Sequence, residues 1–326
     1  MNFGSLVSAM PGALSQGVLY GMMVLGVYIT FRLLDIADMT CDGSFALGGC
    51  VCAVLIANFN VHPVLAILIS VMAGGLAGCV TGLLHTVFEI PAILAGILTQ
   101  YSLWSINLRI MGGKSNTPLL KVETIFSSLL EKLEILLEKL KEIGLIKSLS
   151  IRNAHVALII GVIIAVIVIM ILYWFFGTEL GSALRATGNN EKMIRALGVD
   201  TKKTKLLALM ISNALIAFSG ALVCQSQKYG DIGMGTGAIV IGLASIVIGE
   251  VLFSRFKSFY MKLTGAVVGC CVYFVIRALV LWLGLDPNDM KLLSAIIVAL
   301  ALATPVALAK YRTKKAYSPN GGAGNA

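Results

Sequence analysis

Nine apolar stretches, most of them close to 20 residues long, are the feature that most constrains this chain. A helix of about 20 apolar residues crosses a bilayer, and in the hydrocarbon core a helix satisfies its own backbone polar groups. Of the 326 residues, 58% are hydrophobic and 13% are charged, whereas soluble domains carry about 45–50% apolar and about 25% charged residues. The sequence therefore predicts an all-α, polytopic helical membrane protein that forms a single domain over residues 1–326.

We expect the nine stretches to form transmembrane or partly re-entrant helices. They cover residues 14–34, 43–59, 64–88, 90–110, 154–177, 204–224, 234–253, 262–284 and 291–309. The second stretch is short and begins beside Asp42, Gly43 and Ser44, which is typical of a broken helix whose backbone is covered by protein or water. Glu89 and Pro91 separate the third and fourth stretches and predict a tight hairpin.

The distribution of Lys and Arg, which give a net charge of +9, predicts the orientation. With nine spans, the cation-rich loops would share one side with the C-terminal tail at 311–326, and short cation-rich loops are cytoplasmic. We therefore expect the N-terminus outside and the C-terminus in the cytoplasm. Because the charge marks a membrane face, we expect no nucleic-acid partner. The first cation is Arg32, so the first stretch lacks the basic start of a signal peptide and is expected to be retained.

Residues 111–153 differ in composition from the rest of the chain and are predicted to be an extracytoplasmic insert. Within them, leucines and one isoleucine recur at three- and four-residue steps, and Glu and Lys fill many of the positions between. This pattern predicts an amphipathic helix over 119–150 that is too charged to span a membrane. It lies on the outer membrane surface or against another part of a complex; a solvated connector is the alternative.

No motif for catalysis or metal binding emerges from the sequence. The seven cysteines lie almost entirely within apolar stretches, without a CxxC pair, so we expect small buried hydrophobic residues. Gly113-Lys114-Ser115 resembles the end of a phosphate-binding loop, but position 108 is Leu108 where that motif needs glycine. Three glycines at 233–237 suit a sharp re-entry into the seventh span. We expect a chain that is not an enzyme and binds no metal or cofactor itself.

Glycines recur at intervals of four in three of the spans. They are Gly17 and Gly21; Gly74, Gly78 and Gly82; and Gly265 and Gly269. This spacing lets two helix backbones approach closely in lipid. The pattern has two interpretations, a seam between two copies of the chain or packing between helices of one chain.

Residues 178–203 are predicted to form a cytoplasmic loop that contains a short helix. Asn190, or its neighbour Asn189, can cap the start of this helix, and Glu191 then lies against the positive end of the helix dipole. Gly198 suits the left-handed turn that commonly ends a helix. The sequence therefore predicts both the start and the end of this short helix.

The same short helix carries an apolar stripe of Met193, Ile194 and Leu197, with Lys192 and Arg195 directed elsewhere. A cytoplasmic helix with an apolar stripe is suited to docking in a groove of another protein. A solvated basic loop is the alternative interpretation. The candidate docking residues are Asn190, Glu191, Lys192, Met193, Ile194, Arg195, Leu197 and Gly198.

Residues 181–198, followed by a helix with small residues at 212–220, resemble the coupling loop of ABC importer permeases. The closest family is that of the branched-chain amino acid and sugar permeases. Within it, Phe-Arg-Leu-Leu-Asp-Ile-Ala-Asp-Met-Thr-Cys-Asp-Gly-Ser-Phe at 31–45 and Tyr-Gly-Asp-Ile-Gly-Met-Gly at 229–235 resemble the tryptophan/tyrosine-type branch. The resemblance covers most of the chain, except 119–150.

The resemblance implies a permease subunit in a bacterial plasma membrane that pairs with a second permease subunit, as a homodimer. It implies two cytoplasmic ATPase subunits, which bind ATP and Mg, and an extracellular substrate-binding lipoprotein that delivers the solute. ATPase closure would pull on the helix at 190–197 and drive alternating access. An amino acid, aromatic ones included, is the favoured solute; a sugar, a nucleoside or another small metabolite is the alternative.

Polar residues within the spans are candidates for the translocation pathway, because charge in a membrane is costly. The candidates are Asp42, Ser44, Gln100, Asn107 and Arg277. Arg277 could meet a substrate carboxylate, pair with Asp286 or extend to the interface. Asp42 and Ser44 could line a gate or simply cap a helix. Glu89 and Glu250, near cytoplasmic helix ends, are expected to be structural.

Two other classes of function remain as alternatives. An ion-coupled secondary transporter or channel predicts acidic residues in the middle of spans, and the sequence places almost none between the helix ends. A membrane scaffold that recruits a soluble partner fits the loop. The glycine-rich spans with polar residues favour a pathway over a scaffold.

Overall fold

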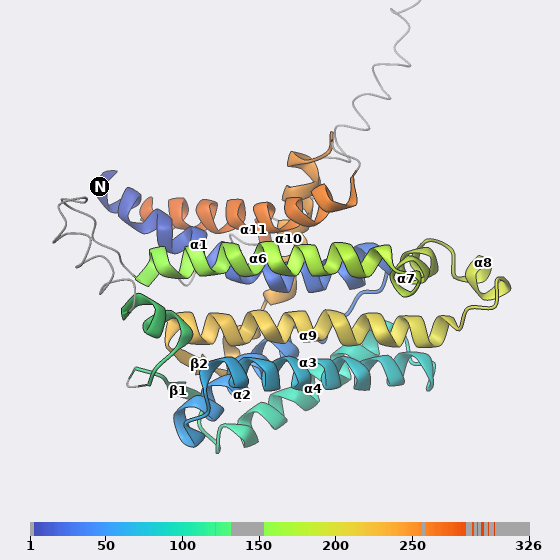
Figure 1. Cartoon of the computed structure of the whole chain (residues 1–326), viewed down its shortest axis with the longest axis horizontal. Coiled ribbons are helices and arrows are strands. Elements are labelled where there is room, and N and C mark those ends of the chain that lie inside the picture. The colour runs from blue at the N-terminus through green and yellow to red at the C-terminus, as the bar shows by residue number, and fades with distance from the viewer. Residues whose placement is uncertain are drawn as a thin grey trace, which may run out of the picture.

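The computed structural model describes residues 3–284 with gaps at 121, 132–152 and 256–257, and isolated residues between 289 and 303. The described chain is almost entirely helical (Figure 1). Its helices are α1 (Phe3–Tyr28), α2 (Cys41–Phe59), α3 (Pro63–Thr86), α4 (Ala92–Ile110), α6 (Asn153–Gly177), α7 (Glu179–Asn189), α8 (Glu191–Ala196), α9 (Thr201–Gln227), α10 (Ala238–Leu252) and α11 (Phe259–Trp282). A π-helical turn, η1 (Ile29–Leu33), extends α1, and a 3₁₀ turn, η2 (Ile232–Gly235), precedes α10.

Seven segments of the described chain are long and apolar enough to cross a membrane, which confirms a helical polytopic membrane protein. They comprise α1 with η1, α2, α3, α6, α9, η2 with α10, and α11. Helix α4, predicted as a span, is 19 residues long but carries polar side chains that lower its hydropathy. The predicted ninth span at 291–309 lies mainly outside the described residues, so a count of nine stays a prediction.

Only the beginning of the predicted amphipathic helix at 119–150 falls within the described residues. Residues 125–131 are helical, and the remainder of that prediction lies outside the described part of the chain. Beside this segment, β1 (Asn116–Pro118) pairs antiparallel with β2 (Tyr229–Asp231), with Thr117 opposite Gly230. The pairing joins two segments far apart in sequence at the end of the bundle where α1 begins (Figure 1).

Helix α9 packs along α3 and also contacts α1 and α2. A Cβ atom added at Gly220 of α9 would overlap the carbonyl oxygen of Phe45, and one at Gly48 of α2 would overlap that of Ala217. The backbones of α2 and α9 are therefore in direct contact at these positions. Only residues as small as glycine permit such an approach.

The three glycine repeats are used for packing within the chain. Gly17 and Gly21 face α11, and Gly74, Gly78 and Gly82 face α9. Gly265 and Gly269 face α10. Of the two interpretations of this pattern, the structure supports contact between helices of one chain.

The link between η1 and α2 explains why the second apolar stretch is short. Asp38 is buried in this link and accepts a hydrogen bond from Asn213 Nδ2 at 2.7 Å, near the middle of α9. Ser44 donates to the Oδ1 atom of the same amide at 2.7 Å. Helix α2 therefore begins level with the middle of α9, and protein covers the non-helical backbone before it, as a partly re-entrant segment requires.

The opposite end of the bundle carries α7 and α8 (Figure 1). There Arg32 pairs with Glu250, and Lys202 Nζ lies 3.3 Å from Glu89 Oε1. Both glutamates thus have the structural roles expected for them. Ahead of α10, the turn η2 and Gly237, with φ of +83°, give the sharp re-entry that the glycines at 233–237 predicted.

The packing against α9 predicts a large difference between two glycine substitutions in the bundle. Gly220→Ala should lower the thermal unfolding temperature of the detergent-solubilised chain, because overpacking costs about 1–3 kcal/mol. Gly75→Ala is the matched control, since the nearest atom to its added Cβ is 3.8 Å away. Equal melting temperatures for the two variants would contradict close backbone contact at Gly220.

Candidate functional site

Helix α7 starts the predicted coupling loop and is fixed at both ends. Thr178 Oγ1 accepts a hydrogen bond from Gly181 N at 3.3 Å, which caps the helix. Near its C-terminal end, a side chain at Gly188 would overlap the carbonyl oxygen of Leu33 in η1. The position of α7 is therefore tied directly to the end of α1.

Helix α8 begins and ends where the sequence predicts. Asn190 has an extended backbone, and its Oδ1 accepts from Met193 N at 3.1 Å, so it rather than Asn189 is the cap. Gly198, with φ of +85°, ends the element in the left-handed conformation. Asp200 then caps α9 by accepting from the backbone N–H groups of Lys202 and Lys203 at 3.1 and 3.3 Å.

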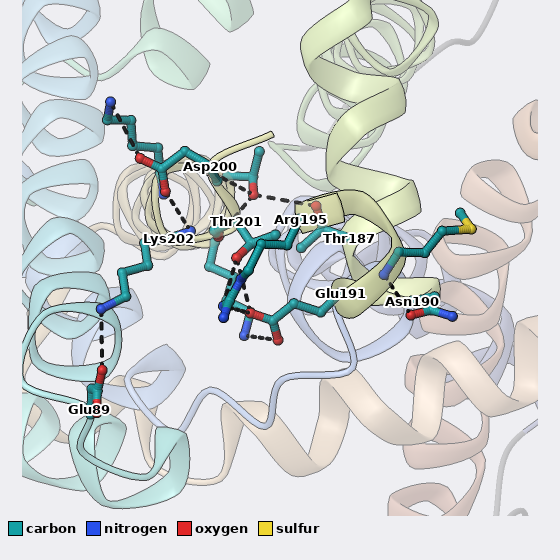
Figure 2. Close-up of polar contacts among 12 residues, drawn as sticks. Glu89, Thr187, Asn190, Glu191, Arg195, Asp200, Thr201 and Lys202 are labelled. Atoms are coloured by element: carbon teal, nitrogen blue, oxygen red, sulfur yellow. Dashed lines mark hydrogen bonds and ion pairs between the residues drawn. The ribbon is translucent and has the colours of Figure 1, made fainter. Parts of the chain in front are cut away.

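Glu191 joins α8 to the start of α9 (Figure 2). Its carboxylate lies 3.0 Å from Arg195 Nη2 and 2.6 Å from Lys205 Nζ, and it accepts from Thr201 Oγ1 at 3.1 Å. Arg195 also donates to Thr201 Oγ1 at 3.2 Å. The hydrogen bond from Lys205 is the largest cause that lowers the pKa of Glu191. The carboxylate is therefore ionised at neutral pH and holds α8 against α9.

The apolar residues of α8 separate into two groups, which differs from the expectation of one exposed stripe. Met193 and Leu197 are 51% and 71% exposed, whereas Ile194 is only 6% exposed. The side chain of Ile194 is buried against the rest of the chain. This follows because α8 packs on its neighbours and so buries one of its faces. Lys192 and Arg195 are exposed beside the two outward-facing apolar residues.

Asp42 and Ser44 make contacts inside the chain. The carboxylate of Asp42 accepts from Gly237 N and Ile239 N, both at 2.9 Å, and so caps α10 rather than its own helix. Ser44 is buried and donates to Asn213. Asp42 therefore caps a helix, but not its own as expected, and a role of Asp42 or Ser44 at a gate stays a prediction.

The remaining pathway candidates lie on two different helices. Gln100 and Asn107 are on α4, which packs against α2 and α3. Asn107 is buried, and its Oδ1 atom has no hydrogen-bond partner among the described residues. Arg277 is on α11, with its guanidinium carbon 5.7 Å from the ring centre of Phe274. Asp286, which was expected as a possible partner of Arg277, lies outside the described residues. The structure does not bring Arg277 together with Gln100 and Asn107 of α4.

Sequence reasoning did not identify Lys205 and Thr201 as partners of Glu191. The pairing of Glu191 with Arg195 follows from their four-residue spacing. By contrast, the partners on α9 depend on how the chain turns between the two helices. The Gly198 and Asp200 signals mark that turn but do not set its direction.

The fold defines a helical membrane protein whose capped helix α8 exposes Met193 and Leu197 at one end of the bundle. Comparisons with known proteins specify its family. The family described as branched-chain amino acid transport system / permease component matches residues 10–311. The chain belongs to this family, as the resemblance carried by residues 181–198 indicated. No solved structure shows a significant match to it.

Individual relatives cover nearly the whole chain. It is 37% identical over 299 residues to the tyrosine transport system permease protein of Clostridioides difficile (strain R20291), covering 91% of this chain and 92% of that protein. It is 30% identical over 295 residues to an uncharacterized protein of Rickettsia prowazekii (strain Madrid E), covering 90% and 96%. It is 22% identical over 249 residues to the probable branched-chain amino acid transport permease protein LivH of Methanocaldococcus jannaschii, covering 71% and 70%. The chain is thus an ABC-type membrane permease.

Glu191→Gln should loosen α8 without unfolding the bundle. Because Lys205 and Arg195 then lose a charged partner, and exposed ion pairs contribute about 0.2–1 kcal/mol each, hydrogen–deuterium exchange at 191–198 should rise about threefold. In the unmodified chain the same loosening should appear only when the pH falls through the lowered pKa of Glu191.

The matched control for this measurement is Glu179→Gln. Glu179 lies in the first turn of α7 and forms no ion pair within the described residues. Exchange that rises equally in both variants would show that Glu191 does not hold α8 in place.

Proposed function

We propose that this chain forms the membrane pathway of an ABC importer in a bacterial plasma membrane, with α7 and α8 in the cytoplasm and the N-terminus outside. Two copies pair as a homodimer, and two cytoplasmic ATPase subunits bind ATP and Mg and supply the energy. An extracellular binding lipoprotein delivers the solute. The observation that carries this proposal is α8, a capped helix at one end of the bundle that exposes Met193 and Leu197.

The contacts of α8 supply a route for mechanical coupling. Movement of an ATPase subunit that holds Met193 and Leu197 would pull on α8, and the ion pair between Glu191 and Lys205 would transmit the pull to α9. Because α9 packs against α1, α2 and α3, its displacement would move the centre of the bundle. This arrangement supports ATP-driven alternating access.

The proposed solute is an amino acid, with tyrosine and related aromatic amino acids as the favoured class. The support is the tyrosine transport system permease of Clostridioides difficile, which aligns with nearly all of this chain. A sugar, a nucleoside or another small metabolite is the alternative solute. Within the membrane, we assign Arg277 to the substrate carboxylate, because charge within a span is costly and marks a functional position. We assign Gln100 and Asn107 of α4 to polar positions of the pathway, because the buried Oδ1 atom of Asn107 has no partner among the described residues and needs a donor.

Met193→Asp combined with Leu197→Asp should abolish binding of the cognate ATPase subunit. Each aspartate would place a charge in the apolar contact, where an unpaired charge is costly. Co-purification of the ATPase with the tagged permease measures binding, and membrane insertion should be unchanged. Met193→Leu with Leu197→Met, which keeps the apolar volume, should retain binding. Undiminished co-purification of the double aspartate variant would contradict the docking role of α8.

Arg277→Ala should reduce tyrosine uptake in reconstituted vesicles by about tenfold or more, since a hydrogen bond to a charged group contributes about 1.5–3 kcal/mol. Arg277→Lys should retain part of the uptake, because it keeps the positive charge. Competition by tryptophan, leucine and ribose in the same assay tests the substrate class. Uptake at the unmodified level by the alanine variant would remove Arg277 from the substrate site, and inhibition by ribose alone would replace the amino acid by a sugar.

A further inference from the structure

We propose that the cytoplasmic ends of α6, α7 and α11 bind one anionic phospholipid of the inner leaflet. In this site, Arg185 receives the phosphate, and one acyl chain lies in the groove between α3, α6 and α9. The inference rests on the proposed orientation but not on transport of any particular solute. It is carried by a polar cavity and an apolar groove that meet at one side chain, Trp174.

The polar cavity has a volume of about 470 Å³ and is lined in part by Thr178, Arg185, Ser258 and Phe259. Thr178 and Ser258 are the residues immediately before α7 and α11. The positive ends of two helix dipoles therefore meet at this cavity, which favours a bound anion. At the start of α11, no side chain caps the free backbone N–H groups.

One cation lines this cavity, and a second cation without a carboxylate partner among the described residues lines the cavity next to it. The guanidinium carbon of Arg185 lies 4.7 Å from the ring centre of Phe259, and Arg185 forms no ion pair with a described carboxylate. An adjoining cavity of about 480 Å³ is lined by Arg185, by Lys262 and by the paired Arg32 and Glu250. Its cations outnumber its carboxylates, so an anionic headgroup would complement the local charge.

Aromatic residues that line or adjoin the cavity are of the kind found at a membrane surface. Tyr173 and Tyr260 stack edge to face at 6.2 Å between ring centres, and Trp174 is 71% exposed. Tyrosine and tryptophan gather at the headgroup level of a bilayer, where one part of the ring system is apolar and another is polar. A cavity bordered in this way opens toward lipid headgroups.

The apolar groove shares Trp174 with the polar cavity and lies between α3, α6 and α9. It has a volume of about 430 Å³, and its lining includes Val71 of α3, Leu172 and Phe175 of α6, and Phe218 of α9. All of its lining residues are apolar or aromatic. A phosphate ion alone would leave this groove empty, whereas a phospholipid fills the polar cavity and the groove together.

The position of the site also separates it from the proposed ATPase contact. No residue of α8 lines the polar cavity, its adjoining cavity or the apolar groove. A phospholipid held between α6, α7 and α11 would stabilise the position of α7 and leave Met193 and Leu197 of α8 accessible. These observations favour a lipid over a soluble protein as the occupant.

Native mass spectrometry of the detergent-solubilised full chain tests the proposal, with equal amounts of phosphatidylglycerol and phosphatidylcholine added. We expect phosphatidylglycerol to be retained in preference, and Arg185→Gln to lower its retention about fivefold, as loss of one cation near a charged lipid predicts. Lys203→Gln is the matched control, because Lys203 is an exposed cytoplasmic cation away from the cavities. Arg185→Lys should retain most of the binding, and Trp174→Ala should weaken it.

Several outcomes would overturn the proposal. One is equal retention of the two lipids, and another is an equal loss of phosphatidylglycerol retention in Lys203→Gln and Arg185→Gln. A third is full competition by soluble glycerophosphoglycerol, which would indicate a phosphate site without an acyl chain. Release of phosphatidylglycerol on addition of the ATPase subunit would instead assign the cavity to a protein contact. Because retention of lipid is measured without ATP or solute, these results are independent of whether the chain imports an amino acid. A thermal unfolding scan of each variant excludes misfolding as the cause of a loss.

Discussion

In a bilayer the surroundings of a helix are as apolar as its side chains, so close contact between backbones takes over much of the role that the hydrophobic effect has in water. Here that contact centres on α9. Gly220 lies against the backbone of α2, and Gly74 and Gly78 of α3 lie against the backbone of α9. These contacts leave no space for side chains between the helices, so a displacement of α9 must be shared by its neighbours.

The segment that contains α7 and α8 is held differently, by charges and helix caps. Helix α8 is too short to be stable by itself, because a few turns of isolated helix are marginal in water. Its stability comes from Asn190 at its start and from the carboxylate of Glu191, which contacts Lys205 on α9. These contacts hold α8 against α9, and α8 presents two apolar side chains, Met193 and Leu197.

Much of this architecture can be predicted from local sequence signals. The apolar stretches give the membrane class, and Asn190, Glu191 and Gly198 give the limits of α8, because caps and dipole effects depend on residues close in the chain. The burial of Ile194 could not be predicted, since it depends on the angle between α8 and α9. The same holds for Asp42, which caps a helix that begins almost 200 residues later, and for the pairing of β1 with β2. Each of these features arises from a contact that leaves no periodic pattern in the sequence.

The amide of Asn213 has a consequence for how the centre of the bundle can move. Its nitrogen donates to Asp38, which precedes α2, and its oxygen accepts from Ser44, which lies in the first turn of α2. Rotation of α9 about its own axis would break both hydrogen bonds together, in surroundings where water cannot replace them. Tilting or sliding of α9 and α2 as a pair would preserve them. The Asn213 amide therefore opposes rotation of α9 relative to α2, and it permits the two helices to move together.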